Sequence, residues 1–422
     1  PSAHCHDKTY VMAVATAWGG NVILISSVAR VLSMVFVGAA LLDMLGRKPV
    51  VAISLFACTA NFLLHWVASL FPHAIALPVL YLTAAFLLLP DACGGAILAM
   101  IADLSPGDLD VRALGFAACS CSEHAATLVV FAASIPILSL FLTSYSKLWF
   151  IFTLACAIIA VGLITVLRET HSNGKFLASE TSSLRVHDLE VSPAAATGPG
   201  GDRFAIRWLA EAASEIQGTW RIVWQDSFLC LALLLNCLFT MSLFGTVAIT
   251  AAYGIGVIGI HQNTMPLAGV IMPTMTMLGS YARAQAVGKV NDFSACRLGN
   301  FFIILGMVLA ALASKFPSAG AALFWVGWGT CGFGTGIFSP ALISLVGLHT
   351  DHHNRGKIFS STQVMFLVGK GVGAAVWTHW LFGGDTTTCF WTSRGFLVSA
   401  AIQLGLLLST SYLQRLHLSL TH

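Results

Sequence analysis

Four ionisable side chains lie deep inside long apolar stretches of this sequence, where charge is costly. Two are basic and two are acidic: Arg30, Asp91, Glu123 and Lys370. Counted inward from the nearest polar loop, all four fall at about 16–23 Å, close to the middle of a bilayer. An uncompensated charge at that depth costs at least ~2.5–3.5 kcal/mol, so such residues usually face a wet cavity and serve function. We expect them to form a substrate and coupling site in a central cavity.

Each of these groups has its own expected chemistry. Burial favours the neutral form of a carboxyl group, so Glu123 or Asp91 could take up and release a proton during transport. Lys370 is flanked by glycines, which leave its ammonium accessible to an anionic solute. His124 follows Glu123 and is assigned to the same cavity, although a lone histidine in a span is more often a hydrogen-bonded core residue. The alternative is a set of static ion pairs with Arg30 or Lys370 that only holds helices together.

Two pairs of short polar loops repeat along the chain. Residues 38–49, with Asp43 followed by Gly46-Arg47-Lys48, have a weaker copy at 280–289, which ends in Gly288-Lys289. The loop that ends at Arg112 is echoed by the loop that ends at Arg355. Gly46 lies 66 residues before Arg112, and Gly288 lies 67 before Arg355. Matching loops at matching spacing indicate two halves built on one plan.

The pattern G-x-x-x-x-D-x-x-G-R-K at residues 38–48 resembles the signature loop between the second and third spans of the major facilitator superfamily. The resemblance implies two pseudo-symmetric helical bundles, twelve spans and transport by alternating access. Residues 102–105 (Ala-Asp-Leu-Ser) and 338–342 (Phe-Ser-Pro-Ala-Leu) resemble the tetracycline-efflux-like and hippocampus-abundant-transcript-like branch. The Gly-rich run ending in Gly-Pro that marks drug antiporters is absent from residues 113–142, so the resemblance does not extend to proton antiport of drugs.

The same resemblance implies that these loops form a cytoplasmic gate. Asp43 ends a helix, where the helix dipole disfavours an anion, so it needs a cation or the start of another helix as a partner. Carried over from the family, Asp43 would contact Arg112 or the start of the 358–382 span when the carrier faces outward. The second copy has Gln285 where the acid is expected, which predicts a weaker latch. Alternatively, the loop only fixes the orientation of the chain. The expected gate residues are Gly38, Asp43, Gly46, Arg47, Lys48, Asp103, Arg112, Gly288, Lys289 and Arg355.

Composition independently places the chain in a membrane. Of its 422 residues only 9% are charged and 57% are hydrophobic, and the mean hydropathy is +0.83. A soluble protein would carry roughly a quarter charged residues. The net charge of +3 and the absence of a basic stripe give no indication of nucleic-acid binding. No metal motif, catalytic triad or phosphate loop occurs in its required context, so we expect no enzyme activity, no cofactor and no metal. The pattern at Gly327, Gly329 and Gly332 matches a dinucleotide motif but follows no strand, and indicates close helix packing.

An all-α polytopic protein with eleven spans is expected, because about 20 apolar residues cross a bilayer. The resemblance implies twelve spans, so the first of the twelve would be missing ahead of Pro1. A truncated or processed chain and a natural eleven-span protein both remain open. The expected spans are 22–45, 50–70, 76–102, 113–142, 148–167, 227–251, 264–282, 294–314, 319–347, 358–382 and 392–413.

The distribution of Lys and Arg predicts the orientation. Of the 21, Arg30 and Lys370 lie within spans, and all but four of the others lie on the side of the signature loops. Positive loops remain in the cytoplasm, so we expect the signature loops, the linker and the C-terminus there. The four exceptions are Lys8, Lys147, Lys315 and Arg394.

The expected organisation is an N-terminal bundle (1–167), a cytoplasmic linker (168–226) and a C-terminal bundle (227–422). Within the linker, apolar residues recur every four positions over 203–224, which predicts an amphipathic helix. It would lie on the inner membrane surface or pack against the ends of the spans.

These observations predict a secondary active transporter for a small organic solute, with an anionic solute and a proton or other coupling ion as expected partners besides membrane lipid. The alternative is a non-transporting membrane subunit or receptor built on the same fold.

Overall fold

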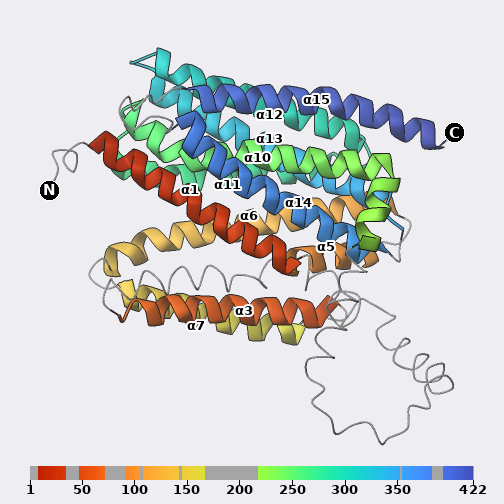
Figure 1. The fold of residues 1–422 in the computed structure, drawn as a ribbon, viewed down its shortest axis with the longest axis horizontal. Helices are drawn as coiled ribbons and strands as arrows, with labels where there is room; N and C mark the ends of the chain where they lie inside the picture. Colours follow the sequence, from red (N-terminus) through yellow and green to blue (C-terminus); the bar gives the residue numbers. More distant parts are fainter. Residues whose placement is uncertain are drawn as a thin grey trace, which may run out of the picture.

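The computed structural model describes residues 8–34, 47–71, 92–104, 108–141, 145–166, 217–351, 354–382 and 393–421. Within these ranges the chain is helical and contains no strand. Figure 1 shows the long helices running side by side along the longest axis of the molecule. The predicted all-α fold is confirmed.

Each expected span corresponds to one helix among the described residues. Helix α1 begins at Lys8, 14 residues before the expected start, because the apolar residues before position 22 continue the helix. Six of the described helices are long and apolar enough to cross a membrane by length and composition. The helices of the first half are α1 (Lys8–Ser33), α3 (Arg47–Ala68), α5 (Ala92–Leu104), α6 (Leu109–Phe141) and α7 (Tyr145–Val166). Those of the second half are α10 (Ser227–Gly256), α11 (Ala268–Gln285), α12 (Asp292–Leu312), α13 (Gly320–Leu348), α14 (Arg355–Val376) and α15 (Arg394–Thr421).

Short polar side chains start several of these helices at the loops. Asp226 accepts hydrogen bonds from the backbone N–H groups of Phe228 and Leu229 at the start of α10. Asn291 does the same for Ser294 at the start of α12, and Asp108 does so at the start of α6. Such caps satisfy backbone donors that the first helical turn leaves unpaired. The loop sequences therefore set where these helices begin.

The helices form two bundles that meet through equivalent pairs. Helix α1 packs on α14, and α11 packs on α6. Helices α1 and α11 each precede one copy of the signature loop, while α6 and α14 begin near Arg112 and Arg355. Each contact therefore pairs the helix before a signature loop in one half with the helix that begins near Arg112 or Arg355 in the other half. This is the arrangement that two pseudo-symmetric bundles require, as predicted.

Most of the linker lies outside the described residues, so the prediction for 203–216 lies outside them too. Residues 217–225 are helical. Val223 is buried, Trp220 packs on the hydrophobic cores, and Trp224 is 71% exposed. This short helix packs against the bundles, and the amphipathic helix expected over 203–224 stays a prediction.

Candidate functional site

Two arginines cross between the bundles at one end of the molecule. Arg112 of α6 donates from Nη1 to the carbonyl of Gly347, 2.7 Å away in the last turn of α13. Arg355 of α14 donates from Nη1 to the carbonyl of Ala102, 2.8 Å away in the last turn of α5. Helix C-termini attract cations because their last carbonyls are unpaired. We call these two reciprocal contacts the arginine clasp, and the end of the molecule that holds them the arginine end.

Asp103 links the clasp to the first signature loop. Its Oδ2 lies 3.4 Å from Nε of Arg47 and its Oδ1 lies 3.7 Å from Nη1 of Arg355. The Asp103 side chain is 4% exposed, so it bridges the two bundles in a buried setting. Burial, together with the neighbouring charge of Arg355, lowers the pKa of Arg112. Among the described residues this network holds more positive than negative charge.

The acid expected there, Asp43, lies outside the described residues, as do Gly38 and Gly46. Lys48 follows Arg47 in the first turn of α3 and is half-buried. The predicted contact of Asp43 with Arg112 therefore stays a prediction.

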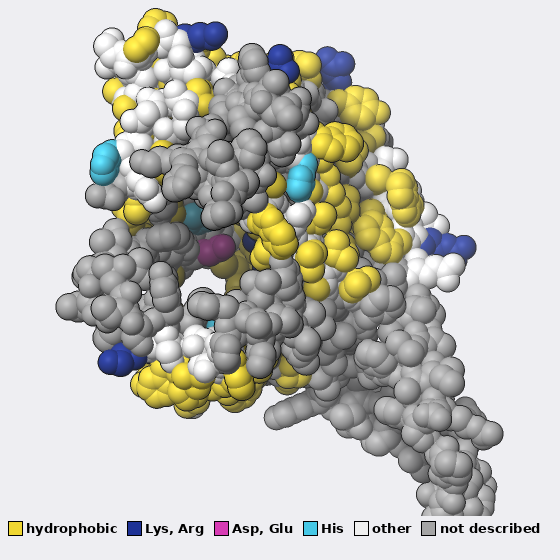
Figure 2. Space-filling view, turned by 60° about the vertical axis from the view of Figure 1, so that its left-hand side comes forward, with side chains coloured by type: hydrophobic (Ala, Val, Ile, Leu, Met, Phe, Trp, Pro, Cys, Tyr) yellow, Lys and Arg dark blue, Asp and Glu magenta, His cyan; other side chains and the backbone are white. Residues whose placement is uncertain are grey.

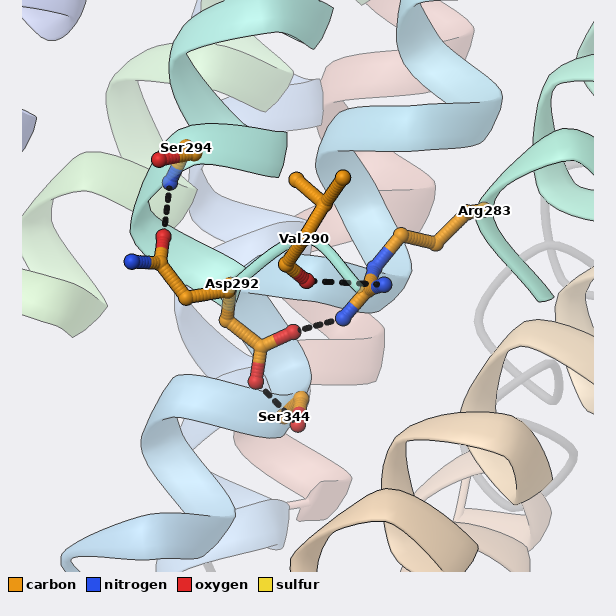
Figure 3. Close-up of polar contacts among 6 residues, drawn as sticks. Arg283, Val290, Asp292, Ser294 and Ser344 are labelled. Carbon is orange, nitrogen blue, oxygen red and sulfur yellow. Dashed lines mark hydrogen bonds and ion pairs between the residues drawn. The ribbon is translucent and has the colours of Figure 1, made fainter. Parts of the chain in front are cut away.

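The second signature loop has its own ion pair, built with a different acid (Figure 3). Arg283 at the end of α11 pairs with Asp292 in the first turn of α12 and donates to the carbonyl of Val290, 3.4 Å away. The other oxygen of Asp292 accepts from Ser344 of α13 at 2.7 Å. The prediction of a weak contact at the second signature loop rested on Gln285 alone. It overlooked Asp292, although Asn291 and Asp292 at the start of a helix indicated an acid near this loop. This cluster ties α11, α12 and α13 of one bundle together.

The second loop also faces the other bundle. Gly288 has a φ of +77°, a backbone conformation that favours glycine. A Cβ at this position would lie 3.5 Å from Oδ2 of Asp110, in the first turn of α6. Lys289 is exposed beside it. Arg47 and Lys48 of the first copy and Gly288 and Lys289 of the second thus both lie at the arginine end, where the bundles meet.

One face of α6 lies along the interface between the bundles, from the arginine end toward the middle of the membrane. Arg112, Phe116 and Glu123 share this face because they are spaced by four and seven residues. Arg112 and Phe116 are buried, and the ring of Phe116 lies 5.7 Å from that of Phe359 of α14. Glu123, about 16 Å further along, is exposed. The bundles therefore close over this face at the arginine end and separate from it at the depth of Glu123.

Arg30 and Lys370 lie at the same depth on two adjacent helices. Gly20 contacts Thr378, and Ser27 contacts Gly371, so α1 and α14 run antiparallel in a fixed register. In that register Arg30 lies opposite a position two residues from Lys370, which is about 3 Å along the helices.

Both cations also point away from the apolar side of the helix pair. Arg30 is two residues from Val28 and two from Leu32, which are 51% and 50% exposed. Lys370 is two residues from Val372, which is 39% exposed. Two residues turn an α-helix by about 200°, so each charge lies some 160° from the exposed apolar side chains. The Nζ of Lys370 lies 5.0 Å from the centre of the Phe244 ring of α10, within cation–π range.

A hollow begins on the Arg30 face of α1 and extends away from the arginine end. A cavity of about 300 Å³ lies between α1 and α10, lined by Ile23 and by small residues that include Gly19, Ala248 and Ala251. Gly19 and Ile23 share a face of α1 with Arg30, since they precede it by eleven and seven residues. Figure 2, which brings this end of the molecule forward, shows an acidic side chain set back from the surrounding surface.

His124 makes a local contact. Its Nδ1 lies 2.7 Å from the carbonyl of Ser120 on the same helix, and a carbonyl can only accept, so Nδ1 carries the hydrogen. Ser120 in turn contacts Ser280 of α11 through hydroxyls 3.0 Å apart, another link between the bundles. Asp91 lies outside the described residues. The described residues contain no group of three or more His, Cys, Asp or Glu placed to hold a metal ion.

Solved structures share this architecture. The human organic anion transporter MFSD10 (TETRAN) superposes with a TM-score of 0.65 at 15% identity, over 95% of this chain and 88% of that one. The proton:xylose symporter XylE gives 0.63 at 13% identity, over 94% and 86%. The transporter FucP in its outward conformation gives 0.62 at 13% identity, over 96% and 97%. At these identities the likeness shows the fold alone.

A curated relative matches part of the sequence. The multidrug resistance protein MdtH of Photorhabdus laumondii is 35% identical over 122 residues, which is 28% of this chain. The match spans 30% of the length of that relative. The family profile of the Major Facilitator Superfamily, in contrast, matches residues 12–374, nearly the whole chain. With its two helical bundles and its repeated signature loops, this integral multi-pass membrane protein belongs to the Major Facilitator Superfamily.

Proposed function

We propose that the chain is a secondary active transporter that binds an anionic organic solute at Arg30 and Lys370. The observation that carries the proposal is the shared depth of these two cations on the inner faces of α1 and α14. Two cations at one level in a membrane attract an anion to the space between them. A solute carboxylate could bind there, and the ring of Phe244 would form an apolar wall beside it.

Glu123 is proposed as the carboxyl group that couples transport to protons. It lies on the interface face of α6 and is exposed where the bundles separate. A carboxylate there can lower the repulsion between the cations when no solute is bound, and protonation would release the cations for the solute. Asp91 remains a second candidate for this role.

The moving parts would be the bundles 1–167 and 227–422, joined by the linker 168–226. The excess of Lys and Arg on the side of the signature loops supports a cytoplasmic arginine end, with the linker and C-terminus on that side. In the structure this end is closed by the arginine clasp, and the hollow lies toward the other end. With a cytoplasmic arginine end, this would be the arrangement of an outward-facing carrier. Transport of a solute, and not covalent catalysis, is the activity that this geometry supports.

Thermal stabilisation by small carboxylates tests the proposal, because a ligand that binds only the folded state raises Tm. The purified full-length chain would be heated with butanoate, benzoate or succinate. We expect at least one to stabilise the wild type and the Lys315→Met control, which removes an exposed cation, but not Lys370→Met. In proteoliposomes Glu123→Gln should keep solute exchange and lose accumulation driven by a pH gradient. Equal stabilisation of Lys370→Met would refute the anion site, and no stabilisation of any variant would favour a non-transporting subunit.

A further inference from the structure

A second cavity lies between α1 and α14, on the side of the helix pair away from Arg30 and Lys370. Its volume is about 130 Å³, and apart from Ser27 and Gly371 it is lined by Val and Leu side chains. Three of these, Val28, Leu32 and Val372, are 51%, 50% and 39% exposed. In a membrane-spanning bundle such an apolar opening faces the hydrocarbon of the bilayer. We call it the seam groove.

The seam groove and the two cations share one depth. Val28 and Leu32 stand two residues to either side of Arg30, and Val368 and Val372 stand two residues to either side of Lys370. The groove and the charges therefore occupy opposite faces of the same stretch of the same two helices. The distance between the two faces is about one helix diameter, on the order of 10 Å.

The wall between them is thin and divides the two bundles. Ser27 meets Gly371 there, and a Cβ on Gly371 would lie 2.8 Å from the Ser27 Cβ. These are the smallest side chains that line the groove. Because α1 belongs to one bundle and α14 to the other, rocking of the bundles separates this contact. A hydrocarbon chain could then run from the groove to the cations without crossing a bulky side chain.

We propose that the seam groove receives the hydrocarbon tail of a solute whose carboxylate binds Lys370 and Arg30. The substrate class is then a single-chain anionic amphiphile such as an alkyl carboxylate. This inference rests on the proposed anion site and extends it across the α1–α14 contact. The small volume of the groove fits one short chain better than the two chains of a bilayer lipid, which is the competing occupant.

Chain-length dependence provides the test. Equilibrium binding of radiolabelled butanoate, hexanoate and octanoate would be measured with the full chain in phosphatidylcholine nanodiscs, with empty nanodiscs subtracted. Each added methylene that enters an apolar groove should tighten binding about fourfold. Val28→Trp fills the groove from an exposed position without touching the Ser27–Gly371 contact. Ile25→Trp is the matched control, since Ile25 is 47% exposed on α1 but does not line the groove.

We expect butanoate to bind all three proteins alike, and only Val28→Trp to lose the gain from hexanoate to octanoate. A wild type that binds butanoate through Lys370 without any chain-length dependence would overturn the groove and leave the anion site standing. An equal slope in Val28→Trp would do the same, because the tail would then bind outside the groove. Absence of butanoate binding from the wild type and from Lys370→Met alike would instead remove the proposed anion site itself.

Discussion

At the scale of single residues, Asp103 carries the strongest argument. It is the acid that, among the described residues, contacts a cation from each bundle, Arg47 and Arg355. Removing one partner from a buried ionic network leaves the other charges uncompensated, which costs about 3–5 kcal/mol. The closed arginine end depends on this network, whereas the opposite end of the molecule does not. A change at Asp103 should therefore act on the conformational equilibrium.

Asp103→Asn should shift the population toward a state in which the arginine end is open. Spin labels at positions 114 on α6 and 418 on α15, both exposed, would report the separation of the bundles by pulsed electron resonance. The distance distribution should move to longer values in Asp103→Asn. Asp351→Asn, at an exposed acid, should leave it unchanged. Identical distributions in wild type and Asp103→Asn would argue against a gating role for the network.

His349 should make stability depend on pH at the same end. The residue caps α13, its Nε2 lies 2.8 Å from Nδ1 of His417, and its ring stacks on Phe228 at 3.7 Å. Burial lowers the pKa of His349 below its ordinary value, against the opposing effect of Asp226. The folded state thus favours the neutral ring. This contribution is fully present above about pH 6.5, the pKa of an unfolded histidine, and is lost as pH falls below it.

Tm measured from pH 8 to pH 5 would test this assignment. The difference in Tm between wild type and His349→Gln should shrink as the pH falls through 6.5. His261→Gln, which changes an exposed histidine near the other end, should track the wild type at every pH. A constant difference between wild type and His349→Gln across the range would contradict the assignment.

At the scale of elements, glycines set how closely the helices of the second bundle pack. A Cβ at Gly373 of α14 would lie 2.1 Å from the carbonyl oxygen of Met241 of α10. A Cβ at Gly336 of α13 would lie 2.0 Å from the carbonyl of Thr276 of α11. Neither backbone can move without shifting its helix. Two of the α13 glycines that match a dinucleotide motif in sequence are packing residues as well, because a Cβ at Gly327 or Gly332 would lie 2.7 Å from the carbonyl oxygen of Gly306 or Met272.

Gly373→Ala should lower stability by about 1–3 kcal/mol, the usual effect of overpacking a dense core. Gly405→Ala is the matched control on α15, because nothing lies within 4 Å of a Cβ there. It should be neutral or slightly stabilising, since alanine is the better helix former. Thermal unfolding monitored by tryptophan fluorescence would separate the two. Equal Tm values for both variants would show that α10 and α14 can separate at no cost.

The sequence predicted where the helices lie along the chain better than it predicted the contacts between them. Apolar length alone located each helix, and repeated loops identified Arg112 and Arg355 as equivalent. Their partners, the carbonyls of Gly347 and Ala102, could not be predicted, because a backbone acceptor leaves no trace in residue type. The contact of Lys370 with Phe244 could not be predicted either, because it joins two helices far apart in sequence. The depth of a residue in the membrane follows from its position along one helix. The direction in which its side chain points, and the residues opposite it on the next helix, depend on how the helices pack.

At the scale of the whole molecule, the proposed alternating access makes this structure one of two states. The arginine clasp, the Asp103 network and the Ser120–Ser280 contact all join the bundles near one end. The cavity beside α1 and α10 lies toward the other. Alternating access requires the first set of contacts to break when the second region closes. A covalent link across the first set should therefore stop transport without blocking solute binding from the open end.

Ser120→Cys with Ser280→Cys makes that link. The two hydroxyl oxygens are 3.0 Å apart, so cysteines at these positions have their Cβ atoms within disulfide range. With neighbouring Cys119 and Cys121 replaced by serine, oxidation should abolish solute exchange in proteoliposomes, and a reducing agent should restore it. Each single variant should transport in both conditions, and the oxidised double variant should still bind solute. Full exchange by a double variant whose disulfide is confirmed by mass spectrometry would mean that α6 and α11 do not separate. The pivot of the molecule would then lie at this contact, and the alternation would have to take place around it.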